Sequence, residues 1–304
     1  MLVPISSYNS FDNFKNFRET FIEEVATNFE ILDKKFSTYN ADDMLQKRID
    51  QTNSCTYLFN HYNGDNVDFI VGLDTSSVAN MSYMFYSCEN ITTIPMLDTS
   101  NATDMNSMFV GCRNLTTIPQ LNTSKVTDMS NMFYLCRNLT IVPQLNTSKV
   151  TNMDSMFRQC EKLTTIPQLD TSNVTNMSYM IQDCDNLSTI PLLDTSKVNY
   201  MSYMFYRCSK LTSIPQLDIS KVTTMYNMFY YCANIEQIHM INIGDDLDIH
   251  YCTKMTREAL LEVLGNLKDL TSSTSKKLTL GSDLLTKLTE DDIALATNKN
   301  WTLA

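Results

Sequence analysis

The stretch "LNTSKVTNMDSMFRQCEKLTTIPQ", residues 145–168, decides the fold, because the chain carries seven variants of it in succession. The seven units run without a gap from Leu73 to Met240, and each has a cysteine at the same position. These cysteines recur every 24 residues, as Cys88, Cys112, Cys136, Cys160, Cys184, Cys208 and Cys232. A fixed period of this length is typical of a solenoid, in which each unit buries its apolar face against its neighbours.

Each unit combines a helical spacing with a short β-type run. Its apolar residues are separated by steps of three and four, as on one stripe of a helix; in the quoted unit they are Val150, Met153, Met156, Phe157 and Cys160. The preceding "LNTS" or "LDTS" supplies side-chain oxygens for the free N–H groups at a helix start. The following "KLTTIPQL" predicts a strand that ends at Pro167, which has no N–H. We therefore predict a helical turn, a short strand and an Asp/Asn-Thr-Ser turn in every unit.

The consensus of the units, LDTSxVTxMxxMFxxCxxLTxIPQ, resembles the BspA-like leucine-rich repeat, in the subtype of bacterial surface proteins and of phage or prophage tail proteins. Residues 255–304 are also similar to the closing segment of such repeat proteins in Gram-positive phages. The resemblance implies an α/β solenoid of the leucine-rich-repeat type, with a helical N-terminal segment and a small α/β C-terminal cap.

The sequence divides into four parts. These are a helical N-terminal segment for attachment or oligomerisation (1–53), an N-terminal cap (54–72), the seven-repeat solenoid (73–240) and a degenerate repeat with the C-terminal cap (241–304). The second part contains "TYLF", which mimics the "SYMF" of the repeats. A cap is expected there because the first unit would otherwise expose its apolar edge.

The C-terminal part shows further helix and strand signals. We predict a helix over Thr256 to Leu267, a strand at "KKLTL", a helix from Glu290 to Thr297 that starts after Thr289, and a last strand at "WTL".

Residues 11–48 carry a different apolar pattern, with Phe14, Val25 and Phe36 spaced 11 residues apart. Such a period gives a nearly straight helical seam. One interpretation is an amphipathic helix folded onto the end of the solenoid. The other is a stalk or virion-attachment helix, which would produce a homo-oligomer, with a trimer favoured. The seam is too short to decide between them.

Composition excludes several classes of protein. The formal charge of −11 and the lack of a basic run argue against a nucleic-acid partner. Six glycines leave no phosphate-binding GxGxxG or GxxxxGK[ST] motif. The sequence contains no run of eighteen apolar residues, so membrane insertion is not predicted. The start "MLVPISSYNSFDNF" has no signal-peptide pattern.

The methionines and cysteines of the units bring soft sulfur atoms together, as a Cu(I) site would require. They lie on the same stripe as Val and Phe, without histidine, so we interpret them as polarizable core side chains. Equivalent side chains in stacked units point in parallel, which is unfavourable for disulfides, and we expect reduced thiols.

No other residues suggest a catalytic or metal site. His61, His239 and His250 have no Ser, Cys or paired carboxylate at a catalytic spacing. The turn "GDDLD" places Asp245, Asp246 and Asp248 close together but lacks the EF-hand spacing, so we interpret it as a solvated acidic turn rather than a calcium site. The sequence thus predicts no enzyme activity, metal or cofactor.

The positions that vary between units are the candidates for recognition, because the stack does not require them. They hold many Tyr and Arg residues, the types enriched at recognition surfaces. The candidates are Tyr83, Tyr86, Tyr134, Tyr179, Tyr203, Tyr206, Tyr226, Tyr230, Tyr231, Arg113, Arg137, Arg158 and Arg207. The alternative is that the tyrosines only shield the helical side of the solenoid. Thr pairs such as Thr116/Thr117 recur in three of the seven units and predict a structural ladder.

The resemblance implies a non-enzymatic phage tail, baseplate or fibre-associated protein that presents the solenoid to a host cell-surface protein or glycan. Its N-terminal segment would contact other virion tail or baseplate proteins. It would be assembled in the bacterial cytoplasm and reside in the virion tail. The alternative is a BspA-like adhesin or protein-interaction module at the bacterial cell surface. A depolymerase would need convergent carboxylates, which the repeats do not offer.

Overall fold

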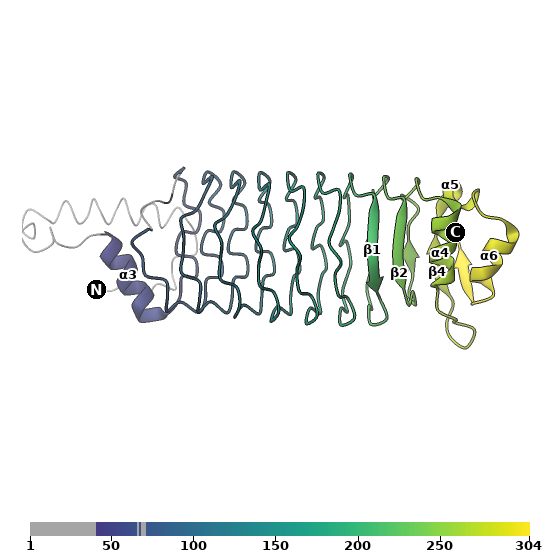
Figure 1. Cartoon of the computed structure of the whole chain (residues 1–304), viewed down its shortest axis with the longest axis horizontal. Helices are drawn as coiled ribbons and strands as arrows, with labels where there is room; N and C mark the ends of the chain where they lie inside the picture. The colour runs from purple at the N-terminus through teal and green to yellow at the C-terminus, as the bar shows by residue number, and fades with distance from the viewer. Residues whose placement is uncertain (1–40, 66, 68–70) are drawn as a thin grey trace, which may run out of the picture.

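The computed structural model of the protein describes residues 41–65, 67 and 71–304. The units stack as rungs along one long axis, with helix α3 (Ala41–Thr52) at the N-terminal end and a small cap at the other end (Figure 1). The seam predicted from Phe14 to Phe36 lies outside the described residues. Within the described residues, no helix is long and apolar enough to cross a membrane.

The MxxMFxxC segment of each unit is a series of tight turns and not the helix that its spacing predicted. In the first unit the Met84 N–H donates to the Met81 carbonyl at 3.3 Å, three residues back. The Phe85 N–H instead leaves the unit and donates to the Met108 carbonyl of the next rung at 2.9 Å. An α-helix would keep both N–H groups for itself. Here every second N–H joins neighbouring rungs.

The reason for the difference is the backbone of two residues per unit. In the quoted unit, Ser155 (φ 55°) and Gln159 (φ 58°) adopt the left-handed conformation, which interrupts a helix. Steps of three and four place residues on one side of consecutive turns as well as of a helix, so the apolar spacing alone did not separate the two. The predicted stripe is nevertheless buried, from Val150 to Cys160.

The hydrogen bonds between rungs have a fixed direction. In the turn segments, N–H groups point toward the C-terminal end: Cys55 donates to Asn80, and Met81 donates to Asp104, both at 2.9 Å. In the column of threonines that precedes the turns, the direction is reversed, as the Thr127 N–H donates back to the Thr103 carbonyl at 2.9 Å.

The predicted strand is realised in two units. β1 (Ser213–Asp218) and β2 (Gln237–Ile241) pair in parallel, whereas the equivalent segments of the earlier units contain no strand within the described residues. The register shifts between Ile214 and Leu217, on either side of Pro215. Because the ladder resumes after it, the proline interrupts the strand rather than ending it.

The core is a set of ladders that run along the axis. Stacked rings of Phe59, Phe85, Phe109, Phe133 and Phe157 lie 5.4–5.7 Å apart, and Phe205 and Phe229 continue the series after Ile181. The cysteines beside them are free and buried.

Each thiol of the seven units donates to a backbone carbonyl in the preceding rung, as Cys112 Sγ does to Phe85 at 3.1 Å. Burial raises the pKa of the Cys232 thiol to about 12, so the group stays protonated and able to donate. The interpretation of the sulfur atoms as core is confirmed.

The N-terminal end is closed by α3 together with residues 54–62. Ile49 of α3 is buried in the core, and the Gln46 side chain bonds both the N–H and the C=O of Asp74, at 2.6 and 2.9 Å. Residues 54–62 form a rung with the geometry of the repeats, since Tyr57 and His61 are left-handed too. Part of the predicted attachment segment therefore covers the solenoid.

The C-terminal cap is a small α/β unit. It contains β3 (Leu247–Asp248), α4 (Arg257–Gly265), β4 (Lys276–Thr279), α5 (Gly281–Leu285), α6 (Glu290–Thr297) and β5 (Trp301–Leu303). The strands form a parallel sheet in the order β3-β4-β5. Thr289 is the N-cap of α6, as predicted. The helix predicted from Thr256 to Leu267 is α4, for which Thr256 is the N-cap and which ends at Gly265. α5 and β3 were not predicted.

Candidate interaction surface

The candidate tyrosines all lie on the side of the solenoid that is formed by the tight turns, which we call the turn face. Tyr83, Tyr86, Tyr134, Tyr179, Tyr203, Tyr206 and Tyr230 are partly buried, whereas Tyr226 and Tyr231 are exposed, by 67% and 48%. The turn face is thus covered by rings that are accessible from solvent but also pack on one another.

The repeat geometry stacks these rings in register. Tyr179 and Tyr203 have the same left-handed backbone (φ 58° and 59°), and their rings are 4.8 Å apart and nearly parallel, at 8°. Tyr206 and Tyr230 are stacked in the same way, at 5.5 Å and 1°. In such a stack the neighbouring ring covers each face. A partner that approaches from the side therefore meets ring edges and hydroxyl groups.

Arg158 lies within the tyrosine series, in a unit that has no tyrosine. Its guanidinium carbon is 5.1 Å from the ring centre of Tyr134 and 5.0 Å from that of Tyr179, one ring on either side in sequence. Both contacts are within cation–π range. The buried Nε of Arg158 has no hydrogen-bond partner within the described residues. Arg158 therefore joins the tyrosine series by ring contacts, with a donor still free.

The other three candidate arginines form ion pairs between neighbouring rungs. The pairs are Arg113–Glu89 (3.5 Å), Arg137–Glu161 (3.2 Å) and Arg207–Asp183 (3.4 Å). Both partners are exposed in the pairs of Arg113 and Arg137, and such exposed pairs contribute roughly 0–1 kcal/mol to stability, whereas Asp183 is mostly buried. Arg113 and Arg137 directly follow the cysteine of their unit, whereas the candidate tyrosines precede that cysteine in the sequence.

Aromatic side chains also meet at the C-terminal end of the turn face. The group, which we call the C-terminal aromatic cluster, consists of Tyr206, Tyr230, Tyr231, His250 and Tyr251. Its ring centres approach to 4.4 Å, for the pairs Tyr230–Tyr231 and Tyr230–Tyr251. Hydrogen bonding to the Tyr251 side chain is the main cause that raises the pKa of Tyr230 above its usual value.

Sequence reasoning missed His250 and Tyr251 in this cluster, and Tyr57 at the other end, which stacks on Tyr83 at 4.6 Å. The reason is that the gapless alignment of units began at Leu73 and stopped at Met240, which left out both ends. Aligning Cys252 with Cys232 would have placed Tyr251 beside Tyr231.

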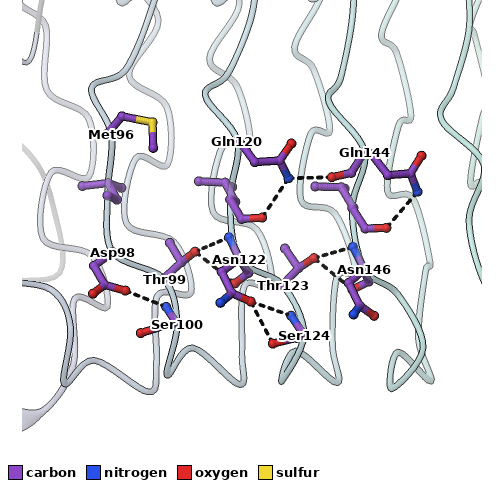
Figure 2. A pocket seen from close by; sticks show the side chains of 13 residues that line it. Met96, Asp98, Thr99, Ser100, Gln120, Asn122, Thr123, Ser124, Gln144 and Asn146 are labelled. Atoms are coloured by element: carbon purple, nitrogen blue, oxygen red, sulfur yellow. Dashed lines mark hydrogen bonds between the residues drawn. The ribbon is translucent and has the colours of Figure 1, made fainter.

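A different side of the solenoid carries a shallow groove of 730 Å³, lined by three consecutive rungs (Figure 2). Its lining residues are Met96–Ser100, Gln120–Ser124 and Gln144–Asn146. A second groove of 480 Å³ occupies the same corner of later units, from Gln168 to Asp218. Figure 2 shows that the labelled polar side chains of the first groove bond to adjacent rungs or to their own turn.

The polar groups of this groove hold the rungs together. The Thr99 hydroxyl donates to the Asn122 carbonyl at 3.0 Å and accepts from the Asn122 N–H at 2.7 Å. Gln120 Nε2 donates to the Gln144 carbonyl at 2.7 Å (Figure 2). The predicted Asp and Asn oxygens accept turn N–H groups, as Asp98 does from Ser100 at 2.9 Å. Their hydrogen-bonding capacity is largely used within the protein.

The threonine pairs form part of the ladder that the sequence predicts. The Thr140 hydroxyl donates to the Thr116 carbonyl at 3.2 Å, and the Thr116 hydroxyl donates to the Thr92 carbonyl at 3.1 Å. The first threonine of these pairs therefore connects rungs.

The acidic turn engages protein donors. Asp245 accepts from Lys276 Nζ at 2.5 Å, and Asp246 accepts from the Lys277 N–H at 2.7 Å. Asp248 Oδ1 accepts from the His250 N–H at 3.1 Å. In the part of the chain that the structure describes, no three His, Cys, Asp or Glu side chains are grouped so as to hold a metal ion.

The sequence and structure were compared with known proteins. Residues 53–142 and 137–242 match the family model described as Mycoplasma protein of unknown function, DUF285. A search of curated protein sequences finds no match for this chain.

Similar solved structures include a leucine-rich repeat protein of T. pallidum, at 17% identity over 43% of this chain and 69% of that one, with a TM-score of 0.29. Another is a leucine-rich repeat protein of Bacteroides ovatus, at 13% identity over 73% of this chain and 86% of that one, with a TM-score of 0.32.

Proposed function

The chain belongs to the DUF285 family, and we propose that it is a non-enzymatic scaffold whose turn face recognises another macromolecule. The observation that carries this proposal is the series of tyrosines, with Arg158 among them, at positions that differ from unit to unit. The core positions of the same units are filled almost alike. Tyr and Arg are the residue types that most often supply binding energy at protein interfaces.

The contrast between the turn face and the groove supports the choice of surface. The groove side chains are hydrogen-bonded to neighbouring rungs, as those of Thr99 and Gln120 are. The stacked pairs Tyr179–Tyr203 and Tyr206–Tyr230 contact each other through their ring faces, which leaves their ring edges for a partner. A partner can therefore bind there without breaking bonds that hold the stack.

The state of the cysteines and histidines supports a non-enzymatic role. Burial raises the pKa of the Cys232 and Cys252 thiols, which disfavours the thiolate that nucleophilic catalysis needs. His239 lies 2.7 Å from Glu262 and His250 lies 2.5 Å from Asp248. Within the described residues, neither histidine is hydrogen-bonded to a serine or cysteine nucleophile, as a catalytic triad would require.

The biological setting that we propose first is a phage tail, baseplate or fibre, in which residues 1–53 attach the protein to other tail proteins and form a homo-oligomer, with a trimer favoured. The packing of α3 against the first rung supports this division, because it joins the segment firmly to the solenoid. The second setting is a bacterial cell-surface adhesin or interaction module. The match to a family of Mycoplasma proteins favours it, since these are proteins of cells.

The test of recognition is binding of the purified full chain to intact cells of strains that carry the gene and of their relatives. Tyr203→Ala with Tyr206→Ala should weaken binding by about tenfold or more, because hot-spot truncations cost about 2 kcal/mol or more. The melting temperature should fall by roughly 10 °C, because the double change removes five ring contacts of about 0.5–1 kcal/mol each, so binding is measured well below it. Leu192→Ala, at an exposed residue of the groove rather than the turn face, is the control.

Unchanged binding by the folded double variant would contradict a role for the turn face. The setting is tested separately, with an antibody to the chain. Detection in purified virions supports the tail setting, whereas labelling of intact uninfected cells supports the adhesin setting and contradicts the tail setting.

A further inference from the structure

Two exposed tyrosines on the turn face depart from the stacked arrangement. The Tyr226 ring makes an angle of 68° with that of Tyr203, at 5.6 Å. The Tyr231 ring is turned by 74° from both Tyr206 and Tyr230. In a stack each ring covers the face of the next, whereas none of the described rings is stacked face to face on Tyr226 or Tyr231. The two residues are 67% and 48% exposed, so a ligand can reach them from solvent.

The rings of Tyr230, Tyr231 and Tyr251 pack directly against one another, at angles of 52–74°, and we call this group the platform. Tyr230 lies 4.4 Å from Tyr231, and Tyr251 lies 4.7 Å from it, as measured between ring centres. A cation held in an aromatic cage must fit between the rings. Rings in direct contact leave no room for it, so the geometry disfavours a quaternary ammonium ligand. A ligand that lies flat on an open ring face fits instead.

Polar groups border this platform. His250 contacts Tyr251, with ring centres 3.9 Å apart, and its Nδ1 is 2.5 Å from Asp248 Oδ1. The Arg207–Asp183 ion pair lies on the preceding rungs, and the Arg207 N–H donates to the Tyr230 carbonyl at 2.9 Å. Carboxylate, imidazole, guanidinium and phenol groups are thus available around the rings as donors and acceptors.

The combination of open ring faces with a polar border matches the chemistry of a sugar ring, which has an apolar C–H face and hydroxyl groups around its edge. We propose that the C-terminal end of the turn face is a carbohydrate-binding subsite, in which sugar rings stack on Tyr226 and Tyr231. This inference rests on the proposed recognition function and names its partner class. The stacked tyrosines in the middle of the turn face, which present edges, contribute contacts with the rest of the partner.

The experiment uses the full chain and two probes: intact cells that the chain binds, and polysaccharide extracted from their envelope and freed of protein. Tyr226→Ala and Tyr231→Ala should each lower the affinity for the polysaccharide by about tenfold, whereas Phe at either position should keep most of it, because the ring face remains. Tyr57→Ala is the matched control. Tyr57 is as exposed, at 49%, but its ring is stacked on Tyr83 at 19°.

The outcomes separate this inference from the proposed function. Polysaccharide binding that is lost in the two Ala variants and kept in the Tyr57 variant supports the subsite. Binding to cells that survives periodate oxidation of their sugars but not protease treatment overturns it in favour of a protein partner, while recognition itself stands. Equal loss in the Ala and Phe variants overturns the stacking geometry. Failure of the unaltered chain to bind any cell overturns both proposals.

Discussion

Single residues with a left-handed backbone allow the units to join, because they turn alternate N–H groups toward the next rung. Most of the described residues with this backbone are not glycine. Gly111 (φ 74°) is an exception, at the position in its unit that Gln159 occupies two units later. A non-glycine residue in this conformation costs roughly 1–2 kcal/mol. The cost recurs along the solenoid and is offset by the bonds between rungs.

Replacing such a residue by glycine should stabilise the protein. For Gln159→Gly we expect a gain of about 0.5–1 kcal/mol, since the relieved strain exceeds the added entropy of an unfolded glycine. Gln159 is partly buried and has φ 58°. Urea unfolding measures the change.

Two variants control this prediction. Lys162→Gly, at an exposed position without positive φ, should destabilise the protein by a similar amount. Gly111→Ala should destabilise it too, because the new Cβ would lie 3.2 Å from Ser87 Oγ in a strained backbone. If Gln159→Gly lowers the free energy of unfolding as much as Lys162→Gly does, the left-handed backbone of Gln159 is not strained.

The buried threonines of the Asp/Asn-Thr-Ser turns should be essential to stability. The Thr123 hydroxyl donates to the Asn146 carbonyl at 2.9 Å and accepts from the Asn146 N–H at 2.8 Å. Thr123→Val keeps the shape but leaves both backbone groups without this partner, at a cost of roughly 2–4 kcal/mol. In Thr127→Val only an exposed hydroxyl is lost, and less than about 1 kcal/mol is expected. Equal effects in chemical denaturation would argue against a role for the buried hydroxyl.

At the scale of elements, the sequence predicted the C-terminal cap better than the repeats. α6 begins after Thr289, as predicted, because its N-cap and the capping box with Asp292 are local features of the sequence. The turn segments were predicted to be helical from the apolar spacing within one unit. That spacing cannot show that alternate N–H groups bond to the next rung. The unit boundaries and buried positions followed from the period, but the angles between tyrosine rings depend on contacts between rungs and did not.

The capping box of α6 should make the C-terminal cap sensitive to acid. Arg257 donates to both oxygens of Asp292 at 2.7 Å, and the Thr289 N–H donates at 2.9 Å. These bonds, that of Arg257 first, lower the pKa of Asp292 to about 2. Because the folded pKa lies below the unfolded one, the stabilisation is complete above pH of about 4 and is lost as the pH falls through about 2.

Asp292→Asn should therefore lower the melting temperature of the cap at pH 7, with the difference from the unaltered chain shrinking toward pH 2. Trp301, the single tryptophan, lies in β5 of the cap and reports its unfolding by fluorescence. Asp291→Asn, an exposed neighbour in the same first turn, is the control. A difference that stays constant from pH 7 to pH 2 would contradict the role of the ionised carboxylate.

At the scale of the whole molecule, each unit bonds mainly to its two neighbours, and the solenoid is a series of equivalent junctions (Figure 1). Deletion of one complete unit, residues 145–168, should leave a folded protein. Gln144 would then take the place of Gln168, whose side chain donates to the Leu192 carbonyl at 2.8 Å. Stability in repeat proteins is approximately a sum over units and junctions, so the loss should be partial.

Deletion of half a unit, residues 145–156, is the matched control. It would place core positions opposite surface positions in the remaining rungs, and we expect it to abolish cooperative unfolding. Circular dichroism and denaturant titration compare the two deletions. A complete-unit deletion as damaging as the half-unit deletion would contradict independent junctions.

The common direction of the turn-face hydrogen bonds has an electrical consequence. Because the N–H of Cys55 and its equivalents all point toward the C-terminal end, the peptide dipoles of the turn face add along the axis. The sum is positive at the C-terminal end, the reverse of an α-helix. Arg48 lies at the negative end, with Nη2 3.5 Å from the Thr56 carbonyl, and Asp248 lies near the positive end. The reversed bonds of the threonine column, which directly precedes the turns in each unit, oppose this field, so a charged molecule experiences these two columns as oppositely polarised.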